Sequence, residues 1–545
     1  MLYLLKLNLK NLSPWEILPF LLLIIFCAPI FIVLSSLFGD YSDNWSHLYN
    51  YVLGDYISST VILIFGVSIL VFFIGTITAW IVTNYDFYGK SFFEWSLILP
   101  LSIPPYILAY TFTGLFDPFG DANNLMRNIF NLSSDVSVFP NVRNIYGAIL
   151  VFSFTLYPYV YLVSRSAFLN QSKSMKESAR LLGLSEIGVF FKLGLPIIRP
   201  AVIGGLMLVI METLSDFGAV DHFAIQTFTT GIFRTWYGMY DLQTAMQLAS
   251  LLLLIVGLFF ILERNSRNNA AFTANNASFV NDNEVKLSGV KSFGAFLACF
   301  IPLFVGFILP ITELIFWSFV NESTFFNQKF LQTSFNTISL AIFAGLITAF
   351  LALIINFSIR LKPGVIIKKL SSLLSIGYAV PSLILAVGMV QLLIYIDSNF
   401  LDTTDIVLTG SLFGLLVAYI IKTYALANSS IESGYEGINS YIDESSKLLG
   451  ATGWSMLRRV HVPLMKTSFL TAALLVMSEV VKELPATLIL RPFNFETLAV
   501  STYIYAAEER MIQAASPAIA IVLIGLIPIV FLSKMIRSSS QSKEK

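Results

Sequence analysis

Long runs of apolar residues recur along the chain and are separated by short polar intervals. A helix needs about 20 mostly apolar residues to cross a bilayer. The strands of a membrane barrel would alternate apolar and polar residues, and runs such as residues 57–83 do not. The pattern therefore predicts an all-α polytopic membrane protein with about twelve spans. We place the spans near residues 17–38, 57–83, 95–116, 144–163, 200–221, 242–262, 293–319, 335–359, 370–396, 406–421, 467–490 and 511–533.

The orientation of these spans follows from the distribution of Lys and Arg, which gather on the cytoplasmic side of membrane proteins. With the N-terminus inside, 26 of the 33 basic residues fall in inside segments and 6 in outside segments, and Lys482 lies within a span. The first apolar run follows Lys6 and Lys10 but lacks a small-residue cleavage site, so we interpret it as a retained span. Both termini are expected to be cytoplasmic.

Composition supports a membrane protein and excludes several other classes. The chain has 545 residues, of which 56% are hydrophobic and 12% charged, with a net charge of zero. Soluble domains contain about 25% charged residues, so a soluble enzyme and a disordered protein are excluded. Without a basic excess, nucleic-acid binding is not expected. The two cysteines and three histidines are too scattered for a disulfide framework or a metal cluster.

An internal repeat relates the two halves of the chain at a constant offset of 267 residues. The segment 177–183, ESARLLG, aligns with 444–450, ESSKLLG, and Pro196 aligns with Pro463. We predict a first half at 1–265, a polar cytoplasmic linker at 266–292 and a second half at 293–545. Each half has six spans, an even number, so the two repeats enter the membrane in the same direction.

The matched segments lie in two basic cytoplasmic loops. In the first, residues Lys173–Leu182 have helical spacing, and Gly183 suits the left-handed position that follows a helix. A second short helix is expected to end at Pro196. Such a helix–turn–helix can dock a partner protein. The alternative is a surface helix held by anionic lipid, but lipid binding requires no fixed register of glycine and proline.

These loops resemble the EAA loop of ABC-importer permeases, which in that family contributes the coupling helix seated in a cleft of the ATPase subunit. The matching positions are Glu177, Ala179, Gly183 and Pro196 in the first half and Glu444, Gly450 and Pro463 in the second, where Ser446 replaces the favoured alanine. The duplication is similar to the fused permeases of the iron(III) and thiamine importer group, and the run 212–241 most resembles the iron(III) branch. The resemblance implies a type I importer fold.

Energy would come from outside this chain, because the sequence contains no nucleotide-binding loop. The nearest candidate, Gly89-Lys90-Ser91, has Asn84 where a Walker A loop requires its first glycine. We expect no cofactor bound by this chain, no catalytic residues of its own, and ATP and Mg used by two copies of a partner ATPase. The resemblance also implies a periplasmic binding protein and a bacterial inner membrane. Alternative functions are a permease for thiamine, sulfate or another small solute, and an ion-coupled secondary transporter.

Acidic residues inside spans are costly and are candidates for function. Glu212 and Asp216 are four residues apart and are expected to share one helix face. Glu479 and Glu483 repeat the pair 267 residues later, with Lys482 as a neighbour. Because carboxylates suit a hard cation, the four residues are candidates for the lining of the translocation pathway. The alternative is that they hydrogen-bond helix breaks or pair with Lys482 and Arg234.

Overall fold

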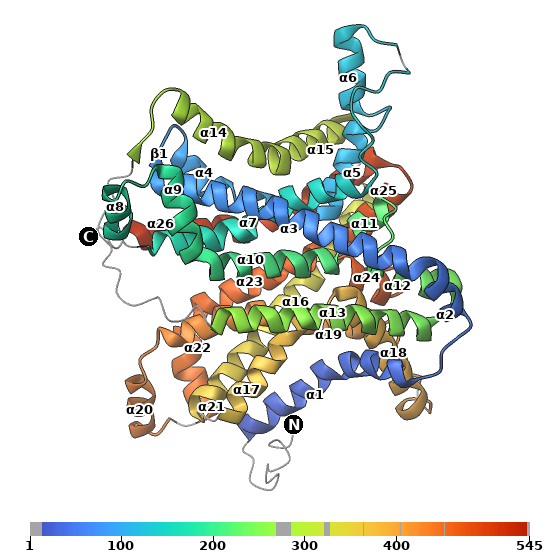
Figure 1. The fold of residues 1–545 in the computed structure, drawn as a ribbon. Helices are drawn as coiled ribbons and strands as arrows, with labels where there is room; N and C mark the ends of the chain where they lie inside the picture. The colour runs from blue at the N-terminus through green and yellow to red at the C-terminus, as the bar shows by residue number, and fades with distance from the viewer. Residues whose placement is uncertain are drawn as a thin grey trace. The chain divides into compact units, whose positions relative to one another are not determined.

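The computed structural model describes residues 14–133, 135–171, 173–268, 285–320, 327–362, 365–403, 405–451 and 453–541. Nearly all of these residues are helical, as Figure 1 shows. The two strands among the described residues are β1 (Tyr85–Asp86) and β2 (Val285–Lys286), which pair in parallel. The predicted linker, 266–292, includes residues 269–284, which lie outside the described residues.

Ten helices are long and apolar enough to cross a membrane, and two sharply bent helix pairs raise the number to as many as twelve among the described residues. Each of the twelve predicted spans overlaps one of them, so the prediction of an all-α polytopic fold is confirmed. The first bent pair turns by 91° between Ser102 and Pro105, and the second by 77° between Leu464 and Lys466. At the first bend Pro104 and Pro105 hold the preceding backbone out of the helical region.

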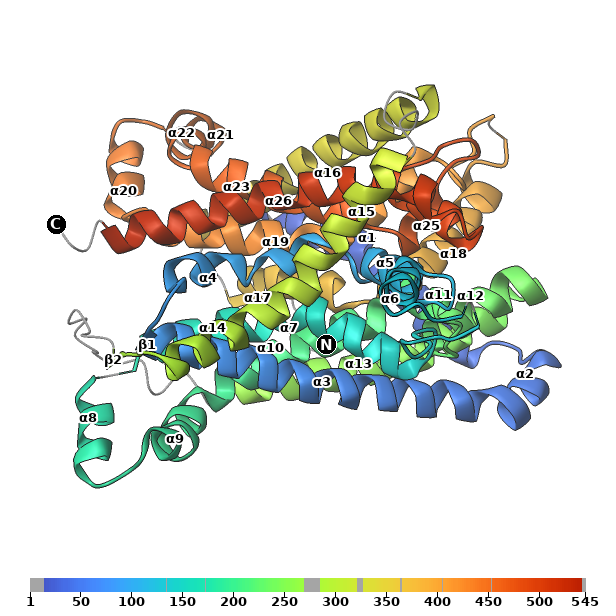
Figure 2. The same cartoon turned by 90° about the horizontal axis from the view of Figure 1, so that it is seen from above.

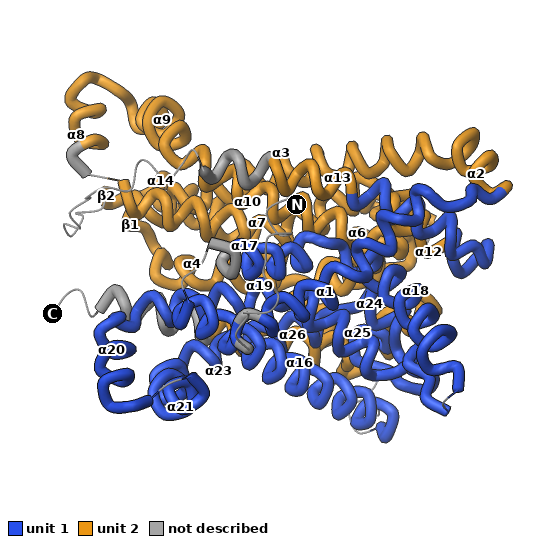
Figure 3. The backbone as a smooth tube through the Cα atoms, turned by 90° about the horizontal axis from the view of Figure 1, so that it is seen from below, with its two compact units in different colours: residues 1–42, 235–253, 325–501 blue, residues 43–234, 254–324, 502–545 orange. Residues whose placement is uncertain are grey.

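The described helices fall into two compact units, which Figure 3 distinguishes by colour. Unit 1 comprises residues 1–42, 235–253 and 325–501. Its helices are α1 (Pro14–Ser35), the beginning of α13 (Leu242–Asn268), α16 (Gln328–Leu361), α17 (Val365–Leu374), α18 (Ser382–Phe400), α19 (Leu412–Glu436), α20 (Tyr441–Leu448), α21 (Trp454–Met456), α22 (Val462–Leu464), α23 (Lys466–Lys482), α24 (Pro485–Leu490) and the start of α25 (Leu498–Ala507).

Unit 2 comprises residues 43–234, 254–324 and 502–545, and α3, α7 and α10 lie side by side in it (Figure 1). Its helices are α2 (Asn44–His47), α3 (Leu53–Asn84), α4 (Lys90–Ser96), α5 (Pro105–Phe116), α6 (Asp121–Phe130), α7 (Ile145–Leu169), α8 (Lys173–Leu181), α9 (Glu186–Val189), α10 (Leu195–Ser215), α11 (Gly218–His222), most of α12 (Phe228–Met239), the end of α13, α14 (Val290–Leu303), α15 (Leu309–Val320), the rest of α25 and α26 (Met511–Gln541).

The first span of each half belongs to the compact unit built mainly from the other half. In unit 1, α1 packs against α17 and α18. The contact is close because Gly388 presents only backbone, and a Cβ there would lie 2.4 Å from the carbonyl oxygen of Pro29. Small residues permit such approaches between membrane helices. In unit 2, α15 packs against α5 and α26. The compact units therefore differ from the predicted sequence halves.

Candidate functional site

The first predicted docking loop forms the short helix α8, which ends in a left-handed turn. Gly183 has a φ of +84°. Its N–H donates to the carbonyl of Arg180 at 2.9 Å, and the N–H of Leu184 donates to the carbonyl of Ala179 at 3.1 Å. These bonds satisfy carbonyls that the helix end leaves open. The prediction of a left-handed glycine directly after this helix is confirmed.

The second loop repeats this geometry 267 residues later. Helix α20 is followed by Gly450, which has a φ of +81°. The N–H of Gly450 donates to the carbonyl of Lys447 at 3.0 Å, and the N–H of Ala451 donates to the carbonyl of Ser446 at 2.9 Å. Both loops thus contain a helix closed by the same pair of hydrogen bonds.

The buried side of each short helix carries a small residue. Ala179 and Ser446, which are equivalent positions in the repeat, are each 7% exposed. The hydroxyl of Ser446 donates to the carbonyl of Ile442 at 2.7 Å, so the serine buries no unsatisfied donor. The departure from alanine in the second half is therefore accommodated within the helix.

The opposite side of each loop presents two leucines to the surroundings. Leu181 and Leu182 are 89% and 84% exposed, and Leu448 and Leu449 are 89% and 88% exposed. The predicted acidic positions Glu177 and Glu444 are exposed as well. Large apolar side chains exposed together next to charged residues are typical of a protein contact surface. We call the pairs Leu181–Leu182 and Leu448–Leu449 the leucine pairs.

The prediction that Pro196 ends the second short helix is wrong. Residues Glu186–Ser215 form one continuous helix, and Pro196 lies in the first turn of α10. The π-helical turn Phe190–Gly194 precedes it, and such a turn inserts an extra residue into the hydrogen-bond ladder. Its equivalent Pro463 lies in α22, directly after the π-helical turn Leu457–His461. Both prolines continue a helix after a π turn.

A guanidinium group holds α20 against the end of α16. Arg360 donates from Nε to the Oδ2 of Asp443 at 2.5 Å. Its two terminal nitrogens donate to the carbonyls of Tyr435 and Ile438, both at 2.9 Å. Arg360 thus satisfies carbonyls at the end of α19 while it fixes the first turn of α20. The planar fork of arginine is suited to such simultaneous contacts.

A buried histidine lies against the other oxygen of Asp443. The Nε2 of His461 is 3.1 Å from the Oδ1 of that carboxylate, and the histidine side chain is fully buried. Its ring packs against Phe357, with centroids 5.0 Å apart, and against Tyr435, with centroids 5.6 Å apart. The second docking loop is therefore attached to α16, α19 and the π-helical turn through one polar centre.

The first docking loop is attached to the end of α3. Lys176 donates from Nζ to the Oδ1 of Asn84 at 2.7 Å. Farther along the loop, Arg180 forms an ion pair with Glu186 at 3.0 Å, and the hydroxyl of Tyr85 donates to the same carboxylate at 3.2 Å. Lys176 and Asp443 are equivalent positions in the repeat, so both loops are fixed at the same place by different chemistry.

Asp216 does not share a helix face with Glu212, because α10 ends at Ser215 and Asp216 has an extended backbone. Its Oδ1 accepts hydrogen bonds from the N–H groups of Ala219 at 2.9 Å and Val220 at 3.4 Å. The carboxylate therefore caps the beginning of α11, where unpaired N–H groups favour an anion.

Glu483 has the same arrangement at the equivalent position, where α23 ends at Lys482. Its carboxylate accepts hydrogen bonds from the N–H groups of Ala486 at 3.1 Å and Thr487 at 3.0 Å, and from the hydroxyl of Thr487 at 2.9 Å. The shared helix face predicted for Glu479 and Glu483 is wrong for the same reason as in the first half. Both carboxylates hydrogen-bond a helix break, as the alternative interpretation proposed.

The other member of each acidic pair lies on the last turn of its helix. Glu479 forms an ion pair with Lys482 at 2.8 Å, which confirms the predicted neighbour. Glu212 is half-buried on α10. Arg234 lies 3.9 Å from Asp221. The pathway role of the four predicted carboxylates stays a prediction.

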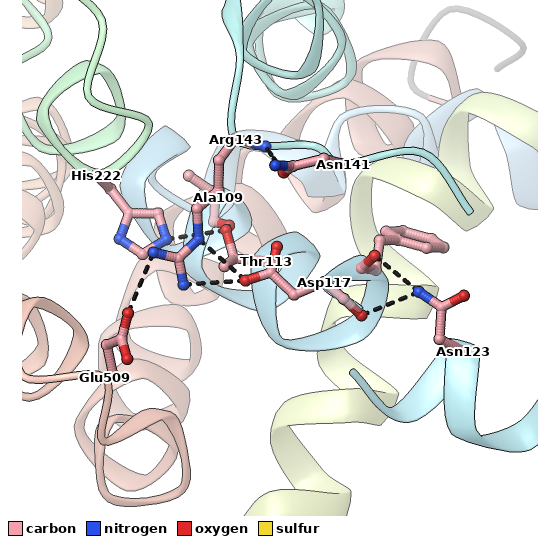
Figure 4. A network of polar contacts seen from close by, with 9 residues as sticks. Ala109, Thr113, Asp117, Asn123, Asn141, Arg143, His222 and Glu509 are labelled. Carbon is pink, nitrogen blue, oxygen red and sulfur yellow. Dashed lines mark hydrogen bonds and ion pairs between the residues drawn. The ribbon is translucent and has the colours of Figure 1, made fainter. Parts of the chain in front are cut away.

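Sequence reasoning missed a polar network in unit 2, which Figure 4 shows. Arg143 bridges Asp117 at 3.0 Å and Glu509 at 3.3 Å. His222 places its Nε2 2.9 Å from the hydroxyl of Thr113. The residues come from α5, the segment before α7, α11 and the turn before α26, so no local motif marks them. The one local sign of this network in the sequence was the adjacent pair of an acidic residue and a histidine, Asp221 and His222.

Next to this network, two tyrosines contact the last residues of α11, Asp221 and His222. The hydroxyl of Tyr503 donates to the Oδ2 of Asp221 at 2.9 Å. The ring centroid of Tyr110 is 4.6 Å from that of His222, and within the described part of the chain its buried hydroxyl has no hydrogen-bond partner. Across the described residues, however, no three His, Cys, Asp or Glu side chains come together as a metal site.

The fold and the site define a multi-span α-helical membrane protein with the same short helix and left-handed glycine turn in each of two repeats. The family described as binding-protein-dependent transport system inner membrane component matches residues 72–263 and again residues 361–540. The chain belongs to this family, and it is an ABC permease of a binding-protein-dependent transport system. Family membership excludes the ion-coupled secondary transporter.

Among its relatives is the Fe(3+)-transport system permease protein FbpB 2 of Haemophilus influenzae, which is 26% identical over 93% of this chain and 95% of its own length. The putative ferric transport system permease protein FbpB 1 of the same organism is 22% identical over 71% of this chain and 61% of its length. The molybdenum transport system permease protein ModB of that organism is 30% identical, but over 26% of this chain and 58% of its length.

Proposed function

We propose that this chain is the permease subunit of an ATP-driven importer of iron(III). The observation that supports iron(III) as the substrate is the length of the aligned region. A permease named for Fe(3+) transport matches 93% of this chain. Permeases named for molybdenum and sulfate transport match about a quarter to a third of it. The alignment with the iron-transport relative thus extends over both repeats.

Two copies of an ABC ATPase subunit are the proposed partners of the docking loops. The support is the repeat itself, because each half presents a leucine pair directly before a left-handed glycine. Glu177, Ala179, Gly183 and Pro196 would form the first contact. Glu444, Gly450 and Pro463 would form the second. The ATPases would bind ATP and Mg, whereas this chain would hold no cofactor.

The proposed pathway residues are Glu212, Asp216, Glu479 and Glu483. Carboxylate oxygens are the ligands that a hard trivalent cation prefers. Asp216 and Glu483 have capping partners, so their negative charge is fixed in place by backbone N–H groups and could attract a cation without moving. We propose that the carboxylates of Asp216 and Glu483 both cap a helix and line the translocation pathway.

The proposed transport cycle is alternating access in a bacterial inner membrane with both termini cytoplasmic. A periplasmic binding protein delivers iron(III) to the outer end of the spans. Closure of the two ATPases on ATP moves the docking loops, and these loops are rigidly attached to α3 through Asn84 and to α16 through Arg360. Movement of the loops therefore turns the spans and opens the pathway outward, and hydrolysis resets it.

Uptake of radiolabelled iron(III) in cells that express the chain with its partners tests the substrate. We expect uptake that unlabelled iron(III) abolishes and that excess sulfate, molybdate or thiamine leaves unchanged. The double variant Glu177→Arg/Glu444→Arg is the matched control for transport through this chain. An absence of iron uptake above this control, with uptake of one of the competitors instead, would assign the permease to that competitor.

A further inference from the structure

Helix α6 in unit 2 buries part of its polar side and exposes much of its apolar side, while Asn124 and Asn128 on the polar side are also exposed. Asn123 and Arg127 are buried, whereas Leu125, Ile129 and Phe130 are 56%, 58% and 64% exposed. At 100° per residue the apolar positions lie on one face and the polar positions on the other. A helix on the surface of a soluble domain has the reverse arrangement, so the exposed face of α6 is adapted to an apolar environment.

Two buried polar side chains of α6, Asn123 and Arg127, fix this orientation. Asn123 donates to the carbonyls of Phe116 at 3.0 Å and Asp117 at 2.9 Å. Its side-chain oxygen accepts hydrogen bonds from the N–H groups of Val138 at 2.9 Å and Phe139 at 3.1 Å. All four bonds connect to the ends of the segments that flank α6. The amide therefore sets which face of the helix points outward.

Arg127 supports the same orientation from one turn farther along. Its Nε donates to the carbonyl of Val136 at 2.9 Å, one terminal nitrogen donates to Asn124 at 2.9 Å, and the other contacts the carbonyl of Pro118. Because its only basic side chain is occupied within the segment, α6 offers no cation for an acidic partner.

The position of α6 indicates what covers its apolar face. Figures 1 and 2 show α6 running across the direction of the spans of unit 2, at the end away from α8 and α9. Its first residue, Asp121, accepts a hydrogen bond at 2.9 Å from the indole N–H of Trp317 on α15. The helix Val290–Val320, which ends with α15, is a candidate span. Its exposed residues near this end include Phe316, Phe319 and Val320.

We infer that α6 lies in the interface of the bilayer, with Leu125, Ile129 and Phe130 inserted among the lipid acyl chains near the head groups. In this placement the apolar face of α6 would meet lipid at the same end of the span as the exposed apolar side chains of α15, to which Asp121 joins it. Tryptophan is enriched at this depth, and helices with one apolar face lie in the plane of the membrane there. The helix anchors the outer end of α5 and thereby Asp117 of the polar network. The inference does not depend on the transported substrate.

Site-directed spin labelling of the full-length chain in phospholipid nanodiscs tests the inference. In a Cys27→Ser/Cys299→Ala background, labels are placed at Leu125→Cys and Ile129→Cys. Asn128→Cys, at an exposed position on the polar side of the same helix, is the matched control. We expect the ratio of oxygen to nickel-chelate accessibility to be several-fold higher at 125 and 129 than at 128. Equal nickel-chelate accessibility at all three positions would overturn the proposal.

The unmodified chain provides a second measurement in case the labelled variants fold poorly. Hydroxyl radicals reach side chains in water but not those inserted in lipid. In nanodiscs, Phe130 is expected to be oxidised several-fold more slowly than Phe493, a phenylalanine in a polar loop that is 94% exposed. Since the structure alone exposes Phe130 by 64%, oxidation at a similar rate would show that water covers this face, and would overturn the inference.

Discussion

Arg360 at the end of α16 donates a hydrogen bond to Asp443 at the start of α20, with a distance of 2.5 Å between Nε and Oδ2. In the other half, Lys176 occupies the position equivalent to Asp443 and donates to Asn84 at the end of α3. The cation comes from the span in one half and from the loop in the other. Both arrangements attach the docking loop to the end of a long span, so a force on the loop reaches the span directly.

Replacement of this guanidinium should weaken the second docking loop. Arg360→Ala removes hydrogen bonds to a carboxylate and to three backbone carbonyls. Hydrogen bonds that involve a charged group contribute about 1.5–3 kcal/mol, so we expect a clear fall in thermal stability and in transport per ATP hydrolysed. The stability of Arg360→Lys should lie between those of the original protein and Arg360→Ala, because lysine keeps the charge but loses the planar set of donors.

Asn84→Ala is the matched control for Arg360→Ala. It removes one hydrogen bond from a charged lysine, together with the bond from its amide to the carbonyl of Trp80. The charged bond contributes about 1.5–3 kcal/mol, so the total loss should be smaller than that of the four hydrogen bonds of Arg360. Thermal unfolding of the purified variants in detergent measures both changes. A larger loss in Asn84→Ala than in Arg360→Ala would contradict the importance assigned to the arginine.

The glycines of the docking loops are needed for their backbone conformation. None of the described residues places an atom within 4 Å of a Cβ built on Gly183 or Gly450, so the cost of a side chain is expected to come from the positive φ. A left-handed conformation costs about 1–2 kcal/mol for an ordinary residue and less for asparagine. Gly183→Asn should therefore retain ATPase binding, whereas Gly183→Val should reduce it. Co-purification of the ATPase measures the difference, and equal loss in both variants would point to a side-chain clash in the complex.

The leucine pairs should contribute to partner binding and not to folding. Leu181→Asp/Leu182→Asp changes two side chains that are more than four-fifths exposed, so the unfolding temperature should stay close to the original value. Assembly with the ATPase should fall by at least tenfold if each leucine contributes about 1.5 kcal/mol or more. Ser178→Asp adds a negative charge on the exposed side of the same helix and serves as the control. If both variants assembled equally well, the leucine surface would have no role in docking.

Neutralisation of the capping carboxylates separates their two proposed roles. Asp216→Asn keeps an oxygen that can accept from Ala219, whereas Asp216→Ala removes the cap and should cost about 1 kcal/mol. If the charge also serves the pathway, Asp216→Asn should lower the iron uptake rate severalfold with little loss of stability. Glu483→Gln provides the same test in the second half. Normal iron uptake in Asp216→Asn and Glu483→Gln would contradict the pathway role of these residues and leave only their role as helix caps.

Some of these features were accessible from the sequence because their causes are local. A run of apolar residues predicts a span wherever it occurs, and the glycine after ESARLL predicts a left-handed turn because few other residues adopt one readily. Spacing alone misplaced Asp216, since the apolar residues 217–220 continue the hydrophobic run past the helix end. The break comes from a side chain that accepts backbone N–H groups, which hydropathy does not record.

Other features depend on partners that are distant in the sequence. Pro196 continues a helix because the π-helical turn at Phe190–Gly194 precedes it, and no local pattern indicates that turn. The packing of α1 on α17 and α18 rests on the close approach at Gly388. Arg143 bridges acids from segments 26 and 366 residues away. A single sequence contains these residues but gives no sign that they are neighbours.

The most direct test of the account is iron(III) accumulation in proteoliposomes that contain the purified permease, its ATPase and the ferric-loaded binding protein. The account predicts uptake that requires ATP on the ATPase side, is abolished by vanadate, persists with an uncoupler, and is lost in the Glu177→Arg/Glu444→Arg variant. Iron uptake that continues without ATP, or ATP-driven uptake that excludes iron while another solute accumulates, would contradict it.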